Sequence, residues 1–167
     1  MKFRELFKKN FINFYLIILI FFLDRISKYF ILKYFELSID QNIYVNSFLS
    51  FNLLWNKGIA FGLLNFEQNL FYNLVTFLIF IILIIVGRLA LKSKGIENIC
   101  YLMILGGGLG NLFDRLYYGS VVDFIDLNYN NFHWFIFNVA DIFISLGITC
   151  LIFVEIFSNK IESKYEK

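Results

Sequence analysis

The stretch LFYNLVTFLIFIILIIV (residues 70–86) contains no charged residue and approaches the roughly 20 residues that cross a bilayer core as a helix. Similar apolar runs lie on both sides of it. The chain of 167 residues is 59% hydrophobic and 17% charged, whereas soluble domains are about 45–50% apolar and about 25% charged. We therefore predict an all-α integral membrane protein. A single domain, residues 1–167, should contain four transmembrane helices at about 11–32, 70–87, 96–114 and 138–157.

Lys and Arg are unevenly distributed between the two sides of these spans. The two terminal segments and the loop at 88–94 hold ten of the 15 basic residues. Because basic residues near helix ends are retained in the cytoplasm, we expect both termini to be cytoplasmic. Two polar excursions, 34–65 and 115–137, should then lie on the outer side. The first has strand-like alternation in VNSFLSFNLLWN (45–56) and a turn signal at Asn56-Lys57-Gly58.

Composition also argues against several classes of function. The basic residues form no patch that could follow a phosphate backbone, so no nucleic acid is expected as a partner. The single histidine, His133, excludes an HExxH zinc site, and we expect no metal and no cofactor. Cys100 and Cys150 each lie inside an apolar run, where we expect them to pack as small hydrophobic residues without forming a disulfide.

Charged side chains inside predicted spans are costly, so each is a functional candidate. Asp24 and Lys28 are four residues apart on one helix face and are expected to form an ion pair, although an anchor at the membrane interface is an equal alternative.

The segment GGGLGNLFDR (106–115) closes the third predicted span. Its spacing Gly106-x-x-x-Gly110 favours close helix contact. We expect Asn111, Asp114 and Arg115 to satisfy one another's hydrogen bonds in its last turn. Packing glycines followed by an interfacial salt bridge are the alternative interpretation.

Two further carboxylates complete the candidate set. Asp123 lies within the apolar stretch GSVVDFID (119–126), where desolvation should raise its pKa. Asn138 and Asp141 begin the fourth span, where Asn138 could simply be a helix N-cap. Paired carboxylates suggest aspartic hydrolysis, in which one acid activates water and the other donates a proton. The residues alone do not decide whether Asp123 or Asp114 is the partner of Asp141.

Two other classes of function remain open at this point. A small ion-coupled transporter could use the same carboxylates as a relay, although it would spread them through the membrane depth. A structural membrane subunit would use them for stability alone.

Five sequence blocks resemble the bacterial prolipoprotein signal peptidases (signal peptidase II) and follow the order of that family along nearly the whole chain. The blocks are DRISK (24–28), NKGIAFG (56–62), GNLFDR (110–115), VVDFID (121–126) and FNVAD (137–141). At two positions, Ile59 and Gly108, the family often has alanine.

The resemblance implies a monomeric aspartic endopeptidase of the bacterial inner membrane, with its active site near the extracytoplasmic face. Its substrate would be a prolipoprotein that carries a diacylglyceryl group, cleaved before the lipidated cysteine, with membrane lipids as surroundings. The implied fold adds a small extracytoplasmic β-sheet and a lid segment to the helices. The catalytic pair would be Asp123 and Asp141. The residues implied to bind substrate or support the site are Asn56, Gly58, Asn111, Arg115, Asn138, Asp24, Lys28 and Asp114.

Overall fold

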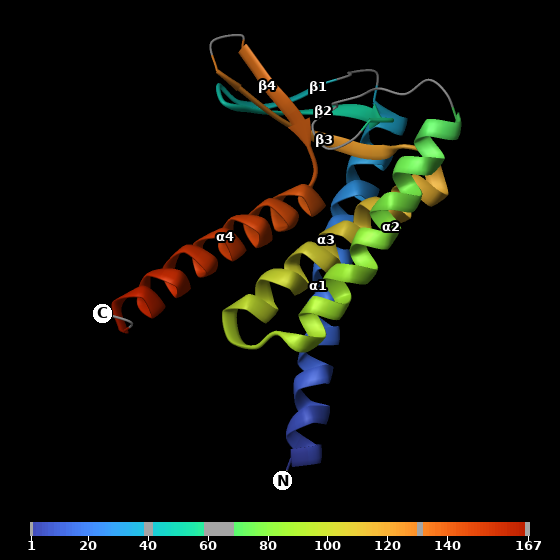
Figure 1. The fold of residues 1–167 in the computed structure, drawn as a ribbon. Coiled ribbons are helices and arrows are strands. Elements are labelled where there is room, and N and C mark those ends of the chain that lie inside the picture. The colour runs from blue at the N-terminus through green and yellow to red at the C-terminus, as the bar shows by residue number, and fades with distance from the viewer. Residues whose placement is uncertain (1, 39–41, 59–68, 130–131, 166–167) are drawn as a thin grey trace.

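The computed structural model describes residues 2–38, 42–58, 69–129 and 132–165, in which long helices carry a small sheet at one end (Figure 1). The first and the last described residues of the chain, 2 and 165, lie away from the sheet. The helices and strands, in chain order, are α1 (Lys2–Leu37), β1 (Asn42–Asn46), β2 (Leu49–Asn56), α2 (Asn69–Lys92), α3 (Gly95–Tyr118), β3 (Val121–Tyr129), β4 (Phe132–Phe137) and α4 (Val139–Tyr165).

Three of these helices are long and apolar enough to cross a membrane within the described part of the chain. They are α2 over Leu70–Lys92, α3 over Gly95–Tyr118 and α4 over Val139–Phe157. Large apolar side chains on their outer faces are exposed, for example Phe77 at 59% and Leu146 at 52%, as expected for a surface that faces lipid. Helices therefore cover the predicted spans at 70–87, 96–114 and 138–157. The predicted span at 11–32 lies within α1. That the four helices cross the membrane stays a prediction.

Helix α3 is central to the bundle, because α1, α2 and α4 all pack against it. Glycines make this close packing possible. A Cβ atom on Gly106 would lie 2.9 Å from the Cβ atom of Ile20 on α1, and one on Gly110 would lie 2.7 Å from Oδ2 of Asp24. One on Gly107 would lie 2.5 Å from the backbone oxygen of Ala140 on α4. The contact predicted from the glycine spacing is thus confirmed.

The four strands form one antiparallel sheet in the order β1-β2-β3-β4. Residues Val121 to Phe124 of β3 are buried, and the paired strands β2 and β3 run beside the end of α3. This is the extra sheet that the family resemblance implies. Residues 59–68, which include Ile59, lie outside the described residues, and the lid stays a prediction.

The first polar excursion begins later than predicted, because α1 continues to Leu37. The alternating stretch 45–56 is also not one strand. It contains a hairpin turn after Asn46, whose side-chain oxygen accepts a hydrogen bond from the backbone N–H of Phe48 at 2.9 Å. The turn signal at Asn56-Lys57-Gly58 marks the end of β2, where the Gly58 N–H donates to Oδ1 of Asn56 at 2.8 Å.

The expectation for the two cysteines is wrong. Cys100 on α3 and Cys150 on α4 are paired as a disulfide, with their Cα atoms 6.1 Å apart. The pairing joins residues 50 positions apart in the sequence, so it depends on how α3 packs against α4, which cysteine spacing does not reveal.

Candidate active site

The first turn of α4 is held by a reciprocal pair of hydrogen bonds. Oδ1 of Asn138 accepts from the backbone N–H of Asp141 at 3.0 Å, and Oδ2 of Asp141 accepts from the backbone N–H of Asn138 at 3.1 Å. This is the geometry of a capping box, in which N-cap and third helical residue satisfy each other's N–H groups. Asn138 is therefore the predicted N-cap, and its cap also fixes one oxygen of the Asp141 carboxylate.

Asp123 lies on β3 with a side chain that is 1% exposed. Its carboxylate accepts one hydrogen bond from Nδ2 of Asn56 at 2.8 Å and one from Nδ2 of Asn138 at 2.6 Å. Asn56 reaches this position because β2 pairs with β3 so that Asn56 lies opposite Val121. The sheet thus brings an amide donor beside a carboxylate 67 residues later in the chain.

Asn138 connects the two carboxylates. Its Nδ2 group donates to Asp123 and also to Oδ1 of Asn111 at 3.1 Å. Asn111 in turn donates through Nδ2 to Oδ1 of Asp141 at 2.8 Å. The two acids therefore meet where β3, α3 and α4 converge, and two asparagines orient them.

The surroundings of Asp123 favour its protonated form. Burial, followed by the nearby charge of Asp141, raises the pKa of Asp123 to about 7. The hydrogen bonds from Asn56 and Asn138 act in the opposite direction and only partly offset burial. The prediction that desolvation raises the pKa of Asp123 is thus confirmed, and this carboxyl can hold a proton near neutral pH.

An ion cluster supports the site from the side of α1. Nζ of Lys28 lies 3.0 Å from Oδ2 of Asp24 and 2.7 Å from Oδ2 of Asp114. Arg25 bridges the same two carboxylates, with Nη2 2.6 Å from Asp24 and Nη1 2.5 Å from Asp114. The predicted pair of Asp24 and Lys28 is confirmed. Arg25 was missed as a site residue, although it stands between them in DRISK.

The cluster also fixes the backbone beside each candidate acid. Oδ1 of Asp24 accepts from the N–H of Ala140 at 3.1 Å, and Oδ2 of Asp114 accepts from the N–H of Val122 at 3.2 Å. These residues immediately precede Asp141 and Asp123 in the sequence. Lys28 adds a hydrogen bond to Oδ1 of Asn111 at 3.1 Å. Because that oxygen must accept, the other end of the Asn111 amide must donate to Asp141.

The predicted mutual bonding of Asn111, Asp114 and Arg115 is wrong. Each of these side chains turns to another element: Asn111 to α4, Asp114 to α1, and Arg115 to the segment after β2. Nη2 of Arg115 donates to the backbone oxygen of Gly58, and its guanidinium stacks over the ring of Tyr72 on α2, 5.2 Å from the ring centre. Side chains that are neighbours on one helix turn need not bond to one another, because partners from other elements can take up their hydrogen-bonding groups.

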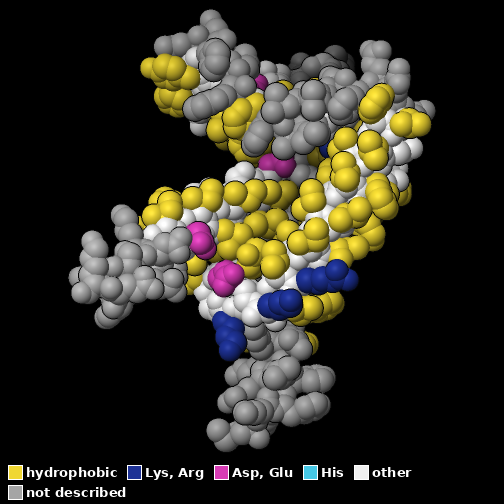
Figure 2. Space-filling model, viewed as in Figure 1, with side chains coloured by type: hydrophobic (Ala, Val, Ile, Leu, Met, Phe, Trp, Pro, Cys, Tyr) yellow, Lys and Arg dark blue, Asp and Glu magenta, His cyan; other side chains and the backbone are white. Residues whose placement is uncertain are grey.

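The acids line a cavity of about 340 Å³ between α2, α3 and α4. Its polar end contains Asn56, Asn111, Arg115, Asp123 and Asp141. Its other walls are mainly apolar, with Ile79, Ile82 and Leu83 from α2, Ile104 and Gly108 from α3, and Ile144, Ser145 and Ile148 from α4. Figure 2 shows the recess between the sheet and the helices on this face, with hydrophobic walls and acidic atoms at its inner end.

Gly108 and Arg115 shape two parts of this cavity. A Cβ atom on Gly108 would meet Cδ2 of Leu83, the end of a flexible side chain that can turn aside, so the glycine leaves room for Leu83 in the cavity wall. Nη1 of Arg115 is buried and has no hydrogen-bond partner among the described residues. An unpaired buried donor on a cavity wall is available for a bound molecule.

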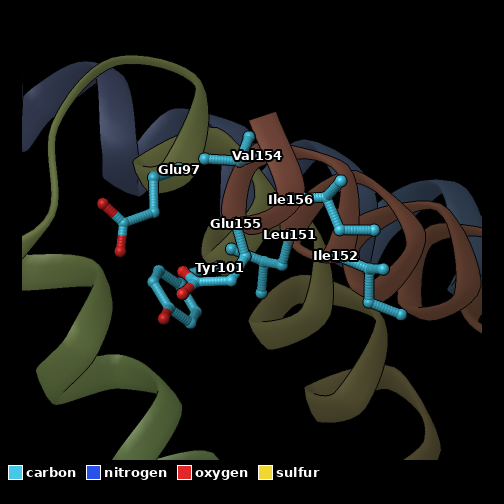
Figure 3. A pocket seen from close by; sticks show the side chains of 7 residues that line it. All are labelled: Glu97, Tyr101, Leu151, Ile152, Val154, Glu155 and Ile156. Carbon is cyan, nitrogen blue, oxygen red and sulfur yellow. The ribbon is translucent and has the colours of Figure 1, made fainter. Parts of the chain in front are cut away.

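A second hollow of about 450 Å³ lies at the opposite end of the bundle, between the start of α3 and the end of α4 (Figure 3). Two carboxylates, Glu97 and Glu155, line it together with Tyr101 and aliphatic side chains. It lacks the buried asparagine links found around Asp123 and Asp141. Among the described residues, no group of three or more His, Cys, Asp or Glu could hold a metal ion.

Comparison with known proteins assigns the chain to a family. The family described as signal peptidase (SPase) II matches residues 16–157. A lipoprotein signal peptidase of Pelagibacter ubique is 47% identical over 152 residues, covering 90% of this chain and 92% of the relative. One from Francisella tularensis subsp. novicida is 35% identical over 151 residues, covering 88% and 92%.

Solved structures agree with this assignment. A structure described as a bacterial membrane enzyme superposes with a TM-score of 0.74 at 27% identity, covering 88% of each chain. A second, with the same description, has a TM-score of 0.68 at 28% identity, covering 85% of this chain and 90% of that one. The chain belongs to the signal peptidase II family.

Proposed function

We propose that this protein is an aspartic endopeptidase that removes the signal peptide from lipid-modified prolipoproteins. The observation that carries the proposal is the placement of Asp123 and Asp141 at the polar end of one apolar cavity, linked through Asn138. The names of the relatives, which are lipoprotein signal peptidases, supply the class of substrate. A transporter relay is disfavoured because the two acids lie together at one end of the bundle.

The two carboxyls take different roles in the proposed reaction. Asp123, whose pKa is raised to about 7, is the protonated acid. Asp141 is the ionised base, since it accepts hydrogen bonds from Asn111 and from the Asn138 backbone on the first turn of α4. A helix N-terminus interacts favourably with a negative charge. The pair shares one proton, and its titration belongs to both groups.

Hydrolysis then follows in two proton-balanced steps. Asp141 removes a proton from a water molecule as the water oxygen bonds to the scissile carbonyl carbon, and Asp123 gives its proton to the carbonyl oxygen. The tetrahedral diol collapses when Asp141 returns its proton to the leaving nitrogen, the C–N bond breaks, and Asp123 recovers a proton from the diol. Each acid ends in its starting state.

The cavity suits a substrate that is held in a membrane. Its aliphatic walls on α2, α3 and α4 can hold the apolar part of a signal peptide, while the buried Nη1 group of Arg115 can donate to a carbonyl at the polar end. We propose that Asn56, Gly58, Asn111 and Asn138 position the acids, and that Asp24, Lys28 and Asp114 support them through the ion cluster. No cofactor takes part in these steps.

The proposed setting is the inner membrane of a bacterium. The distribution of basic residues supports four spans with both termini in the cytoplasm, and this orientation places the sheet and the acid pair at the extracytoplasmic face. We propose that residues 1–167 form one domain that acts as a monomer among membrane lipids, with a lid over the site.

A cleavage assay on matched precursors tests the proposal. Purified full-length protein in lipid vesicles is given a prolipoprotein that carries a diacylglyceryl group and, separately, the same precursor without it. Cleavage of the modified precursor alone, immediately before its lipidated cysteine, is the expected result. Failure to cut the modified precursor would contradict the proposed activity, and equal cleavage of both would contradict the proposed substrate class.

A further inference from the structure

Ser145 is a hydrogen-bonding group on an otherwise apolar part of the cavity wall. Its side chain is exposed and lines the cavity between Ile144 and Ile148 on α4. Serine hydroxyls inside a helix commonly donate to the carbonyl four residues earlier, as Thr76 does to Tyr72 at 2.9 Å. Within the described part of the chain, the Ser145 hydroxyl makes no such bond and has no other partner.

The position of Ser145 relative to the acid pair sets what it can reach. It follows Asp141 by four residues, so it lies on the same face of α4, about 6 Å further from the sheet. A peptide can be hydrolysed only where its backbone is accessible, and an extended backbone advances about 3.3 Å per residue. Two residues of extended substrate therefore span the distance from Asp141 to Ser145.

The direction of the substrate follows from the reaction. A signal peptide precedes its cleavage site, and its apolar segment is the part that occupies the membrane. The chain on the N-terminal side of the scissile bond thus runs from the acid pair along the apolar wall toward Ser145. The carbonyl oxygens of an extended substrate lack the hydrogen bonds that they would accept within a helix. An unpaired carbonyl in an apolar environment is costly.

We propose that the Ser145 hydroxyl donates a hydrogen bond to a backbone carbonyl of the substrate. The carbonyl belongs to the residue two positions before the one whose carbonyl carbon is attacked. Ser145 is a positioning residue that holds the signal peptide extended in the membrane. This inference rests on the proposed function. A hydrogen bond between neutral groups contributes about 0.5–1.5 kcal/mol, so its loss should lower kcat/KM by about two- to tenfold.

A substrate with one altered amide isolates this bond. The full-length enzyme is assayed with a lipid-modified peptide and with the same peptide carrying an alkene in place of the amide whose carbonyl Ser145 would contact. Ser145→Ala should lose about two- to tenfold in kcat/KM on the normal peptide and nothing further on the alkene peptide. Ser145→Thr should restore the rate on the normal peptide. Thr149→Ala, one turn further along α4 at a residue that lines a separate hollow and not this cavity, should behave like the wild type.

The outcomes separate this inference from the proposed function. A wild type that leaves the normal peptide intact would overturn the proposed function and this inference with it. A wild type that cleaves, with Ser145→Ala either unaffected or slowed by the same factor on both peptides, would overturn the role of Ser145 alone. Equal slowing is the signature of a structural effect or of a bond to another part of the substrate, such as an ester of the lipid.

Discussion

Replacing Asn138 separates helix capping from catalysis, because two different atoms of this side chain do the two tasks. Its Oδ1 atom caps α4 by accepting from the Asp141 N–H, while its Nδ2 group donates to Asp123. Serine is as good an N-cap as asparagine. Its side chain is too short to reach Asp123 in place of the asparagine Nδ2 group. Asn138→Ser should therefore retain the cap and lose the donor, whereas Asn138→Ala should lose both.

The expected magnitudes follow from these contacts. The hydrogen bond from Asn138 goes to the protonated, neutral form of Asp123, and a bond between neutral groups contributes about 0.5–1.5 kcal/mol, so both variants should lose roughly two- to tenfold in kcat/KM. Asn138→Ala should also unfold more easily than Asn138→Ser by about 1 kcal/mol, the usual effect of losing a cap. Cleavage rates on a lipid-modified peptide and thermal unfolding in detergent measure the two effects.

The pH dependence supplies a separate check. The Asn138 hydrogen bond lowers the pKa of Asp123 against the larger effect of burial. Without it the pKa of Asp123 rises, so the alkaline limb of the pH–rate profile should move to higher pH in both variants. Asn138→Ser with wild-type activity and an unmoved alkaline limb would refute the assignment of Asp123 as the protonated acid.

Three further predictions follow from the structure. The wild-type kcat/KM should fall as pH rises through about 7, because Asp123 then loses the proton it must donate, and a flat pH–rate profile from 6 to 9 would count against this role. Lys28→Met should lower the free energy of unfolding by about 3–5 kcal/mol, because the buried carboxylates of Asp24 and Asp114 lose a cationic partner. The control Lys33→Met, at an exposed position, should change this free energy by less than about 0.5 kcal/mol. Gly107→Ala should lower the free energy of unfolding by about 1–3 kcal/mol and impair cleavage, because its Cβ meets the backbone of α4. The control Gly87→Ala makes only an ordinary contact at 3.8 Å and should be tolerated. Thermal unfolding of the two lysine variants and of the two glycine variants measures these effects.

Local patterns predicted the helices well. The apolar runs located α2, α3 and α4, since about twenty mainly apolar residues have few alternatives to a membrane helix. The pairing of Asp24 with Lys28 was also predictable, because residues four apart on a helix share a face. The capping role of Asn138 followed in the same way from its position before an apolar helical run.

Contacts between distant segments could not be derived from the same patterns. The choice between Asp114 and Asp123 depends on how β3 lies against α1 and α4, and only the family resemblance favoured Asp123. In the structure Asp114 forms ion pairs with Arg25 and Lys28, while Asp123 lines the cavity. Asparagine partners such as Asn56 reach Asp123 through strand pairing, which one sequence does not specify.

The proposed reaction depends on Asp123 and Asp141 acting as a pair. The most direct measurement is the cleavage rate of a lipid-modified precursor by Asp123→Asn and Asp141→Asn, with Asp126→Asn as the control. Asp126 is a buried carboxylate on the same strand as Asp123, but its oxygen accepts from Ser50 and Asn52 and it does not line the cavity. We predict losses of about a thousandfold or more in both site variants and near wild-type cleavage in the control. Substantial cleavage by either folded site variant would contradict the paired-acid mechanism.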